Sequence, residues 1–324
     1  MIKKYLKRKL KLKIFLLVLL IFMIPLFIVS CVSVFTIFIA GSDEIEIAKC
    51  FDIPYEYLKQ AYDEVEAYNE KVEKEKEKAK EKGKRIDFRK IDFVDVLVHS
   101  ASLANLDVDN YDSSIFDKAI EKAINEDEFT GLEEFINEIF SKYYKDIETG
   151  PIPEKKIEYE YNKRTGKKEK VTAYYDYTSV DDFGADRTYG GSRRHEGNDI
   201  MADKGTPIVS MTDGKVTKME WNDYGGWRIG ITTDKGTYFY YAHLDRYEDG
   251  IKEGDKVKAG DVIGYVGDTG YGPPVTTGKF DPHLHLQIGI KLDENDEEYT
   301  WINPYNIVKF LDDFRVTLGE DEED

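Results

Sequence analysis

The feature that most constrains how this chain can fold is a stretch of 27 consecutive residues, 14–40, without a single charged side chain. About 20 apolar residues are enough to cross a bilayer as a helix. Residues 1–13 carry seven Lys or Arg and no acidic residue, and acidic residues begin at residue 43. The positive-inside rule therefore predicts a cytoplasmic basic segment at 1–13, a transmembrane helix at 14–40 and an extracytoplasmic remainder. We expect a single-pass protein of the cell membrane with its N-terminus in the cytoplasm.

Two other interpretations of this stretch stay open. A cleaved signal peptide has an apolar core of roughly 7–15 residues, which is shorter than the run seen here. The letters IVSC at 28–31 resemble a bacterial lipobox, which would place lipid on Cys31. The chain stays apolar for nine residues beyond Cys31, however, so we favour the membrane-spanning helix.

Charge and cysteine content exclude two classes of protein. Beyond the basic segment the chain holds 39 basic and 64 acidic residues, a net charge of −25. Such an acidic body argues against a nucleic acid partner, because phosphate contacts need basic patches. Cys31 and Cys50 are the two cysteines, which is too few for a disulfide scaffold or a cysteine-rich zinc module. A metal site would have to use His, Asp or Glu.

Residues 43–148 are predicted to form a small helical module. Apolar residues recur every three to four positions over 52–82, with Asp52 as the expected N-cap, and further helices are expected within 91–106, 113–124 and 131–144. His99 lies among apolar neighbours and is expected to be a packed structural residue. The sequence indicates neither chemistry nor a protein partner for this module.

The pattern changes to β after residue 149. Residues 149–178 are predicted to be a linker and a β-hairpin around the letters RTGK, because apolar and polar residues alternate on both sides. Over 179–310, turn signals such as TDGK, KEGD and KAGD separate short alternating strands, and no helical period appears between 175 and 300. We expect a mainly β domain of antiparallel sheets at 179–310, followed by an acidic tail at 311–324.

Four of the five histidines lie between residues 195 and 285. His283 and His285 belong to the run FDPHLHLQIGI, where residues two apart share one face of a strand and Leu284 points to the other. His195 and Asp199 lie four residues apart in RRHEGNDI, and imidazole and carboxylate are both good zinc ligands. With one histidine of HLH they would make three ligands, which is the pattern of a catalytic zinc. His243, after an aromatic strand, is the remaining member.

The segments HEGND (195–199), YAHL (241–244) and HLH (283–285), in this order, resemble the three motifs of the M23 peptidases of the LytM or lysostaphin type. These are zinc endopeptidases that cut peptidoglycan, and the resemblance covers about 180–308. It implies a mainly β, LytM-like catalytic domain. It further implies that His195, Asp199 and His285 bind zinc and that His243 and His283 are unmetallated catalytic residues.

A narrower resemblance concerns 225–231 and 270–285, which look like the membrane-anchored L-Ala–D-Glu endopeptidases of spore-forming bacteria, the LytH type. It implies a peptidoglycan stem peptide as substrate and a role in cell-wall or spore-cortex remodelling. Two alternatives are a catalytically silent docking or scaffold protein of the sporulation envelope and an M23 endopeptidase that cuts cross-bridges.

The expected mechanism needs a base, and the helical H-E-x-x-H motif that usually supplies one is absent. A neutral histidine is suited to accept a proton near pH 7. We therefore expect His243 or His283 to take the proton from water and the other to stabilise the oxyanion; the sequence does not assign the two roles. Expected substrate contacts are Arg228, Tyr240 and Tyr271, with further candidate cations at Arg193, Arg194 and Lys279.

Overall fold

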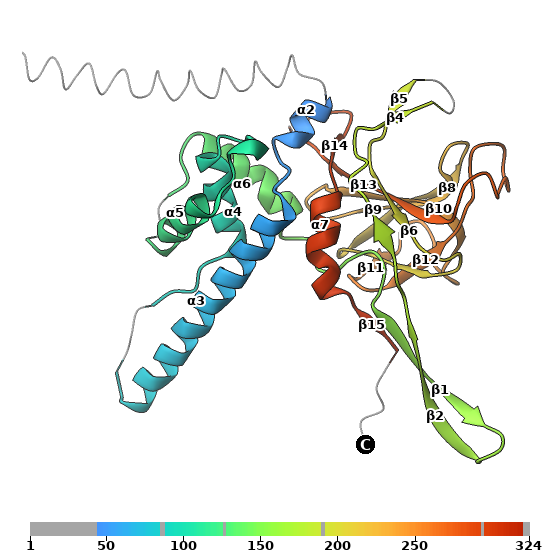
Figure 1. Ribbon diagram of the computed structural model, residues 1–324, viewed down its shortest axis with the longest axis horizontal. Coiled ribbons are helices and arrows are strands. Elements are labelled where there is room, and N and C mark those ends of the chain that lie inside the picture. The colour runs from blue at the N-terminus through green and yellow to red at the C-terminus, as the bar shows by residue number, and fades with distance from the viewer. Residues whose placement is uncertain (1–43, 85–87, 126–127, 189–191, 293–294, 320–324) are drawn as a thin grey trace, which may run out of the picture.

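The computed structural model describes residues 44–84, 88–125, 128–188, 192–292 and 295–319 (Figure 1). The predicted basic segment 1–13, the predicted membrane helix 14–40 and Cys31 lie outside these residues. Within the described ranges, no helix is long and apolar enough to cross a membrane.

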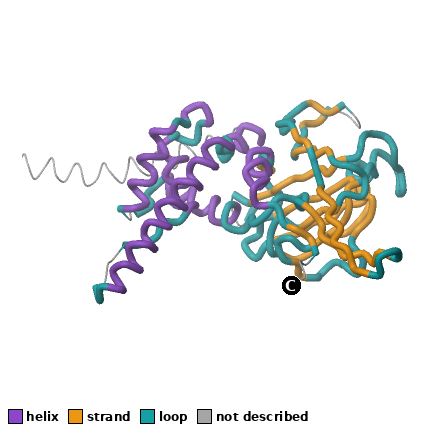
Figure 2. Tube along the Cα trace, turned by 60° about the horizontal axis from the view of Figure 1, so that its bottom comes forward, coloured by secondary structure: helices purple, strands orange, loops and turns teal. Residues whose placement is uncertain are grey.

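A helical region precedes the β-domain, as the sequence predicted. Helices occupy one end of the molecule and strands the other (Figure 2). The bounds are α2 Glu44–Lys49, α3 Tyr55–Glu81, α4 Phe93–Leu103, α5 Ser113–Ile124 and α6 Leu132–Tyr143, with a 3₁₀ turn at Val108–Asn110. Asp92 caps α4 by accepting a hydrogen bond from the amide of Val94, and Asp112 caps α5 in the same way. His99 is buried, and its Nδ1 lies 3.0 Å from Glu133 Oε1, so its predicted structural role is confirmed.

One helix start differs from the prediction. Helix α3 begins at Tyr55, directly after Pro54, so Asp52 is not its N-cap. The Asp52 carboxylate instead accepts hydrogen bonds from Asn306 Nδ2 at 2.7 Å and Asn303 Nδ2 at 2.9 Å, both from the far end of the chain. Asn303 Nδ2 also lies 3.1 Å from Asp181 Oδ1, so a chain of polar side chains joins the helical module to the β-domain.

Most of the β-domain is one antiparallel sheet. Its strands are β3 Thr178–Ser179, β6 Asn198–Met201, β7 Pro207–Val209, β8 Gly214–Asn222, β9 Gly226–Thr232, β10 Tyr238–Tyr247, β11 Lys256–Val257, β12 Val262–Val266, β13 His283–Ile290 and β14 Thr300–Ile302. The central order is β11-β8-β9-β10-β13-β6-β3, with β12 bridging β10 and β7. The mainly β, antiparallel fold is thereby confirmed.

Alternation along the strands divides the sheet into an apolar and a polar face. Leu284, Leu286, Ile229 and Ile231 are fully buried on the core side. On the other face the pairing register places one polar or aromatic side chain per strand in a row from β6 to β8, in the order Asp199, His285, Tyr240, Arg228 and Glu220. This row is the foundation of the candidate site.

Smaller elements complete the domain. The predicted hairpin is present as β1 Lys155–Asn162 and β2 Lys167–Tyr174, and β15 Thr317–Leu318 pairs with β1. A short ribbon, β4 Asp186–Arg187 and β5 Arg193–Arg194, precedes β6. Helix α7 Tyr305–Phe310 leads into a 3₁₀ turn at Leu311–Phe314, and the Arg315 guanidinium then donates to the carbonyls of Ile152 and Pro153. The chain after α7 is thus fastened to the linker before β1.

Candidate active site

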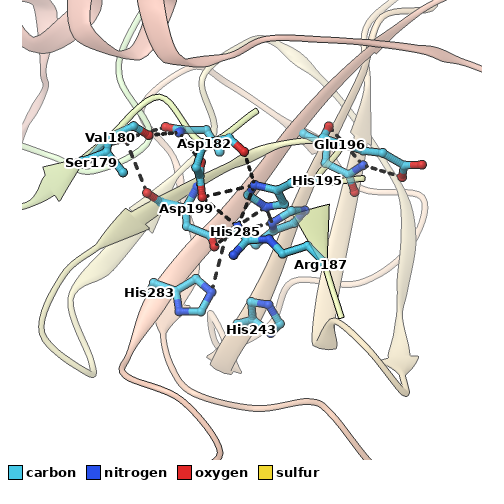
Figure 3. Close-up of polar contacts among 12 residues, drawn as sticks. Ser179, Val180, Asp182, Arg187, His195, Glu196, Asp199, His243, His283 and His285 are labelled. Atoms are coloured by element: carbon cyan, nitrogen blue, oxygen red, sulfur yellow. Dashed lines mark hydrogen bonds and ion pairs between the residues drawn. The ribbon is translucent and has the colours of Figure 1, made fainter. Parts of the chain in front are cut away.

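Three side chains meet at the polar face of the sheet. Asp199 on β6 and His285 on β13 are direct cross-strand partners, and His195 comes from the turn just before β6. Gly197 makes this turn possible, because a Cβ there would lie 2.3 Å from the carbonyl oxygen of Leu286. His195 Nε2 lies 2.9 Å from His285 Nδ1 and 3.2 Å from Asp199 Oδ1, and the latter two atoms are 3.0 Å apart (Figure 3).

This triangle fits a zinc ion. Tetrahedral zinc with bonds of 2.0–2.1 Å separates neighbouring ligand atoms by about 3.3 Å, which is close to the three observed separations. Two imidazole nitrogens and one carboxylate oxygen are a donor set that zinc accepts. His195, Asp199 and His285 therefore form the zinc site, as the sequence predicted, and three protein ligands leave a fourth position for water or substrate.

A second layer, not predicted from the sequence, fixes the first ligand. His195 Nδ1 lies 3.0 Å from the main-chain oxygen of Asp182 and 3.2 Å from its Oδ2. A carbonyl can only accept, so Nδ1 carries the proton and Nε2 has its lone pair free for the metal. The other oxygen of the Asp182 carboxylate accepts a 2.7 Å hydrogen bond from Asn198 Nδ2. Asp182 thus holds the His195 ring in the ligating tautomer and orientation.

Arg187 joins this second layer to the third ligand set. Its Nη2 donates to Asp182 Oδ2 and to Asp199 Oδ2, each at 2.7 Å. The same nitrogen lies 2.7 Å from His195 Nδ1, but both atoms carry protons in the ligating tautomer, so the two carboxylates are its acceptors. One guanidinium therefore fixes the oxygen of Asp199 that faces away from the metal position. No motif spacing marks Asp182 or Arg187 in the sequence, and both lie in a loop whose course only the fold defines.

The ionisation of the triad reflects these contacts. Burial alone would raise the pKa of Asp199, but the hydrogen bonds and positive charge of His195 and His285 hold it well below its usual range. Burial lowers the pKa of His195, whereas hydrogen bonds to Asp182 and Asp199 raise it further, to about 9 in net. Zinc requires the carboxylate to be charged and displaces the proton on the His195 nitrogen that binds it. The site keeps the first ready and makes zinc compete for the second.

His243 reaches the site through a β-bulge. In a regular strand it would point away from the face that Ala242 presents. The pairing of β10 with β9 shifts between Tyr241 and Leu244, and His243 adopts a left-handed φ of 63°. Its ring then lies 4.7 Å from that of His283 and 5.9 Å from that of His285. A bulge placed here re-aims one side chain toward the metal site.

The two unmetallated histidines have the same tautomer. His243 Nδ1 lies 2.8 Å from the carbonyl of Thr269, and His283 Nδ1 lies 2.8 Å from the carbonyl of Asp281. Both Nδ1 atoms therefore carry protons, and both Nε2 lone pairs remain available. His283 Nε2 lies 3.7 Å from Asp199 Oδ1. Burial, with the nearby His283 and His285, lowers the pKa of His243 well below its usual value, so its ring is neutral near pH 7.

The predicted substrate contacts occupy different places. Tyr240 packs edge-on against His285 with ring centroids 5.9 Å apart, and Tyr271 packs edge-on against His243 at the same distance. Phe280, which the sequence reading did not single out, lies 4.6 Å from His243. The tyrosines thus border the site, whereas Arg228 lies behind Tyr240, 5.3 Å from its ring, and forms an ion pair with Glu220.

Comparisons with known proteins agree with this geometry. The model of peptidase family M23 matches residues 193–298. The L-Ala–D-Glu endopeptidase of Bacillus subtilis is 48% identical over 130 residues, which are 40% of this chain and 39% of that protein. The glycyl-glycine endopeptidase ALE-1 of Staphylococcus capitis is 39% identical over 29% of this chain and 24% of its own. The chain therefore spans well under half the length of these two relatives.

A solved structure covers more of the molecule. It comes from Ruminococcus gnavus, is provisionally named a glycyl-glycine endopeptidase lytM, and superposes with a TM-score of 0.52 at 35% identity. The match covers 69% of this chain and 85% of that one, so it extends beyond the residues that the family model matches.

Proposed function

The chain belongs to peptidase family M23, and from this premise we propose that it is a zinc endopeptidase that hydrolyses the L-Ala–D-Glu bond of peptidoglycan stem peptides. The observation that carries the proposal is the combination of a complete ligand triad with two neutral histidines beside it. His195, Asp199 and His285 have their ligating atoms within 4.8 Å of one another, and His243 and His283 present Nε2 lone pairs next to them. A protein that served only for docking would not need the second pair.

The protein's own groups divide the work as follows. Bound zinc supplies Lewis-acid chemistry, which makes water nucleophilic near neutral pH and polarises the scissile carbonyl. Nε2 of one histidine of the pair His243 and His283 accepts the proton of the attacking water. The other, once protonated, donates to the oxygen on which negative charge develops. The Thr269 and Asp281 carbonyls hold both rings so that Nε2, not Nδ1, takes part.

The bond specificity is the finer part of the proposal. Support comes from the identity of 48% with the Bacillus subtilis L-Ala–D-Glu endopeptidase. The second candidate is cleavage of glycine cross-bridges, which is favoured by the likeness to ALE-1 and to the Ruminococcus gnavus structure. We rank it lower because the identity is lower, at 39% and 35%.

Membrane attachment is likewise proposed, on the sequence of 1–40 alone. A charge-free run preceded by seven basic residues would anchor the chain with its catalytic domain outside the cytoplasm. Membrane fractionation, followed by protease treatment of intact cells, tests it. Full-length protein that is recovered in the membrane and is digested from outside supports the anchor, and protein found in the soluble fraction contradicts it.

The decisive experiment for the activity uses defined muropeptides. The purified protein is incubated with uncross-linked stem peptides and with glycine-bridged dimers, with and without a chelator, and products are read by mass spectrometry. Chelator-sensitive release of a peptide that lacks its N-terminal L-Ala supports the proposal. Cleavage only within the glycine bridge moves the second candidate ahead, and zinc-loaded protein that cuts neither substrate contradicts both.

A further inference from the structure

The proposed bond poses a recognition problem that this inference addresses, and the inference therefore rests on the proposed function. A glutamate whose amino group lies in the scissile bond uses one carboxyl to continue the peptide and keeps the other free unless it is amidated. Glycine in a cross-bridge has no such group. An enzyme that selects this glutamate needs a cation close to the metal site, and a guanidinium can bind a carboxylate through two parallel hydrogen bonds.

Most cations around the site are already neutralised. The guanidinium of Arg187 binds Asp182 and Asp199, and that of Arg228 binds Glu220. Arg194 lies 3.6 Å from Asp186 and donates to a main-chain carbonyl at 3.0 Å. Lys279 is exposed, and nothing printed in its surroundings fixes its ammonium in one place.

Arg193 differs from all of them. Among the residues that the structure describes, no carboxylate lies within ion-pair distance of its guanidinium. Its Nε is buried and has no acceptor there either, and a buried unpaired donor is costly. The guanidinium is nevertheless held in place, since it lies over the ring of Tyr224 with a separation of 5.4 Å. A positioned cation with unmet hydrogen-bonding capacity is what a carboxylate ligand would satisfy.

The position of Arg193 suits a ligand group next to the scissile bond. It lies two residues before the zinc ligand His195 and pairs with Arg187 across the β4–β5 ribbon. Arg187 fastens one strand of this ribbon to Asp199, and Arg193 reaches Tyr224 in the β8–β9 turn. Burial raises the pKa of Tyr240, and the charges of Arg228 and Arg193 act against this rise, so Arg193 also lies near the ring that contacts His285.

We propose that Arg193 is the specificity residue of this enzyme and binds the free carboxylate of the glutamate on the amine side of the scissile bond. Tyr224 holds the guanidinium flat, and the substrate supplies the acceptor that the described part of the protein lacks. Amidation of that carboxylate removes the charge and half of the acceptor capacity, so it should weaken binding in the same way as loss of the guanidinium.

The test compares two substrates that differ in this one group. Stem peptides with a free and with an amidated glutamate carboxylate are hydrolysed by the wild-type protein and by Arg193→Gln and Arg193→Lys. We expect the wild type to prefer the free acid. In Arg193→Gln, kcat/KM for the acid should fall about 10- to 100-fold, the range of one lost charge-assisted hydrogen bond, mainly through KM. The amidated substrate should be cut as before, and Arg193→Lys should restore part of the preference.

The matched control is Arg194→Gln, which removes the same charge from the neighbouring residue of the same ribbon and should leave both substrates unaffected. Lys279→Gln tests the remaining free cation. The ratio between two substrates does not depend on the folded fraction, so a destabilised variant still gives an answer. An unchanged ratio in Arg193→Gln, an equal loss on both substrates, or a ratio that collapses in Lys279→Gln instead would overturn the inference. A wild type that cuts another bond overturns the proposed function itself.

Discussion

The ring of His243 donates its Nδ1 proton to the main-chain carbonyl of Thr269 across 2.8 Å. Because this bond leaves Nε2 as the free acceptor, we predict that His243→Ala and His283→Ala each lower kcat by about two to four orders of magnitude, the usual contribution of a general acid or base. Zinc content should stay at one equivalent in both variants. Metal analysis of the purified proteins beside hydrolysis rates measures the two quantities separately.

The contrast to these variants is His285→Ala, which removes a ligand and should lose zinc and activity together. Equal loss of metal in all three variants would contradict the division into ligands and catalytic residues.

Thr269 pins the bulge that carries His243. Its hydroxyl donates to the carbonyl of Leu244 at 2.7 Å and accepts from the amide of Trp227 at 3.1 Å. We predict that Thr269→Val, which keeps the shape and removes both bonds, costs about 1–3 kcal/mol of stability and lowers kcat at full zinc occupancy. Thr276→Val, an exposed hydroxyl that bonds only to Pro273, is the control. A variant with normal kcat would show that the bulge holds without the hydroxyl.

Asp182 should set zinc affinity without touching zinc. Second-layer partners of a metal-bound histidine typically contribute 10- to 100-fold in affinity. We therefore expect Asp182→Ala to weaken zinc binding by about this factor, measured by competition with a chromophoric chelator, while the unfolding midpoint of the metal-free protein changes little. Asp186→Asn, on an exposed carboxylate of the same loop, should bind zinc normally. Unaltered affinity in Asp182→Ala would mean that the main-chain oxygen alone orients His195.

Asp52 predicts a pH dependence of stability. Burial raises its pKa to about 6, against hydrogen bonds from Asn306 and Asn303 that lower it. The folded state then holds this proton more tightly than the unfolded state, so the stabilisation is full below about pH 4 and is lost as pH rises through 6. The shift corresponds to about 3 kcal/mol. Chemical unfolding at pH 5 and pH 7.5 should show this fall.

In Asp52→Asn, which cannot titrate, the fall in stability between these two pH values should shrink by the Asp52 share. A fall of the same size in this variant would assign it to other groups.

Much of the site was predictable because its signals are local. The i and i+2 relation of His283 and His285 follows from strand geometry alone, and the ligand types of His195 and Asp199 follow from zinc chemistry. The resemblance then separated ligand from catalytic histidine. The helices at 113–124 and 131–144 were likewise found from their periodicity, and α5 begins and ends at the predicted residues.

The missed features all depend on contacts between residues distant in sequence. Asp52 looked like a cap because its neighbours suit a helix start, yet its partners Asn303 and Asn306 lie some 250 residues away. Asp182 and Arg187 carry no spacing signature, since a loop brings them to the metal ligands. A strand pattern also gives no sign of the bulge at His243, where a non-glycine residue takes a positive φ.

The hydrogen-bonded chain from Asp52 through Asn303 to Asp181 has a practical consequence for dissecting this protein. The family match at 193–298 holds every zinc ligand and both catalytic histidines but omits Asp182, Asn303 and the helical partner of Asn303. A truncation at those limits would keep the reacting groups and discard the residues that orient them. The smallest self-sufficient unit of this peptidase is therefore larger than its recognisable motif region, and a useful excision would begin before Asp52 and continue past Arg315.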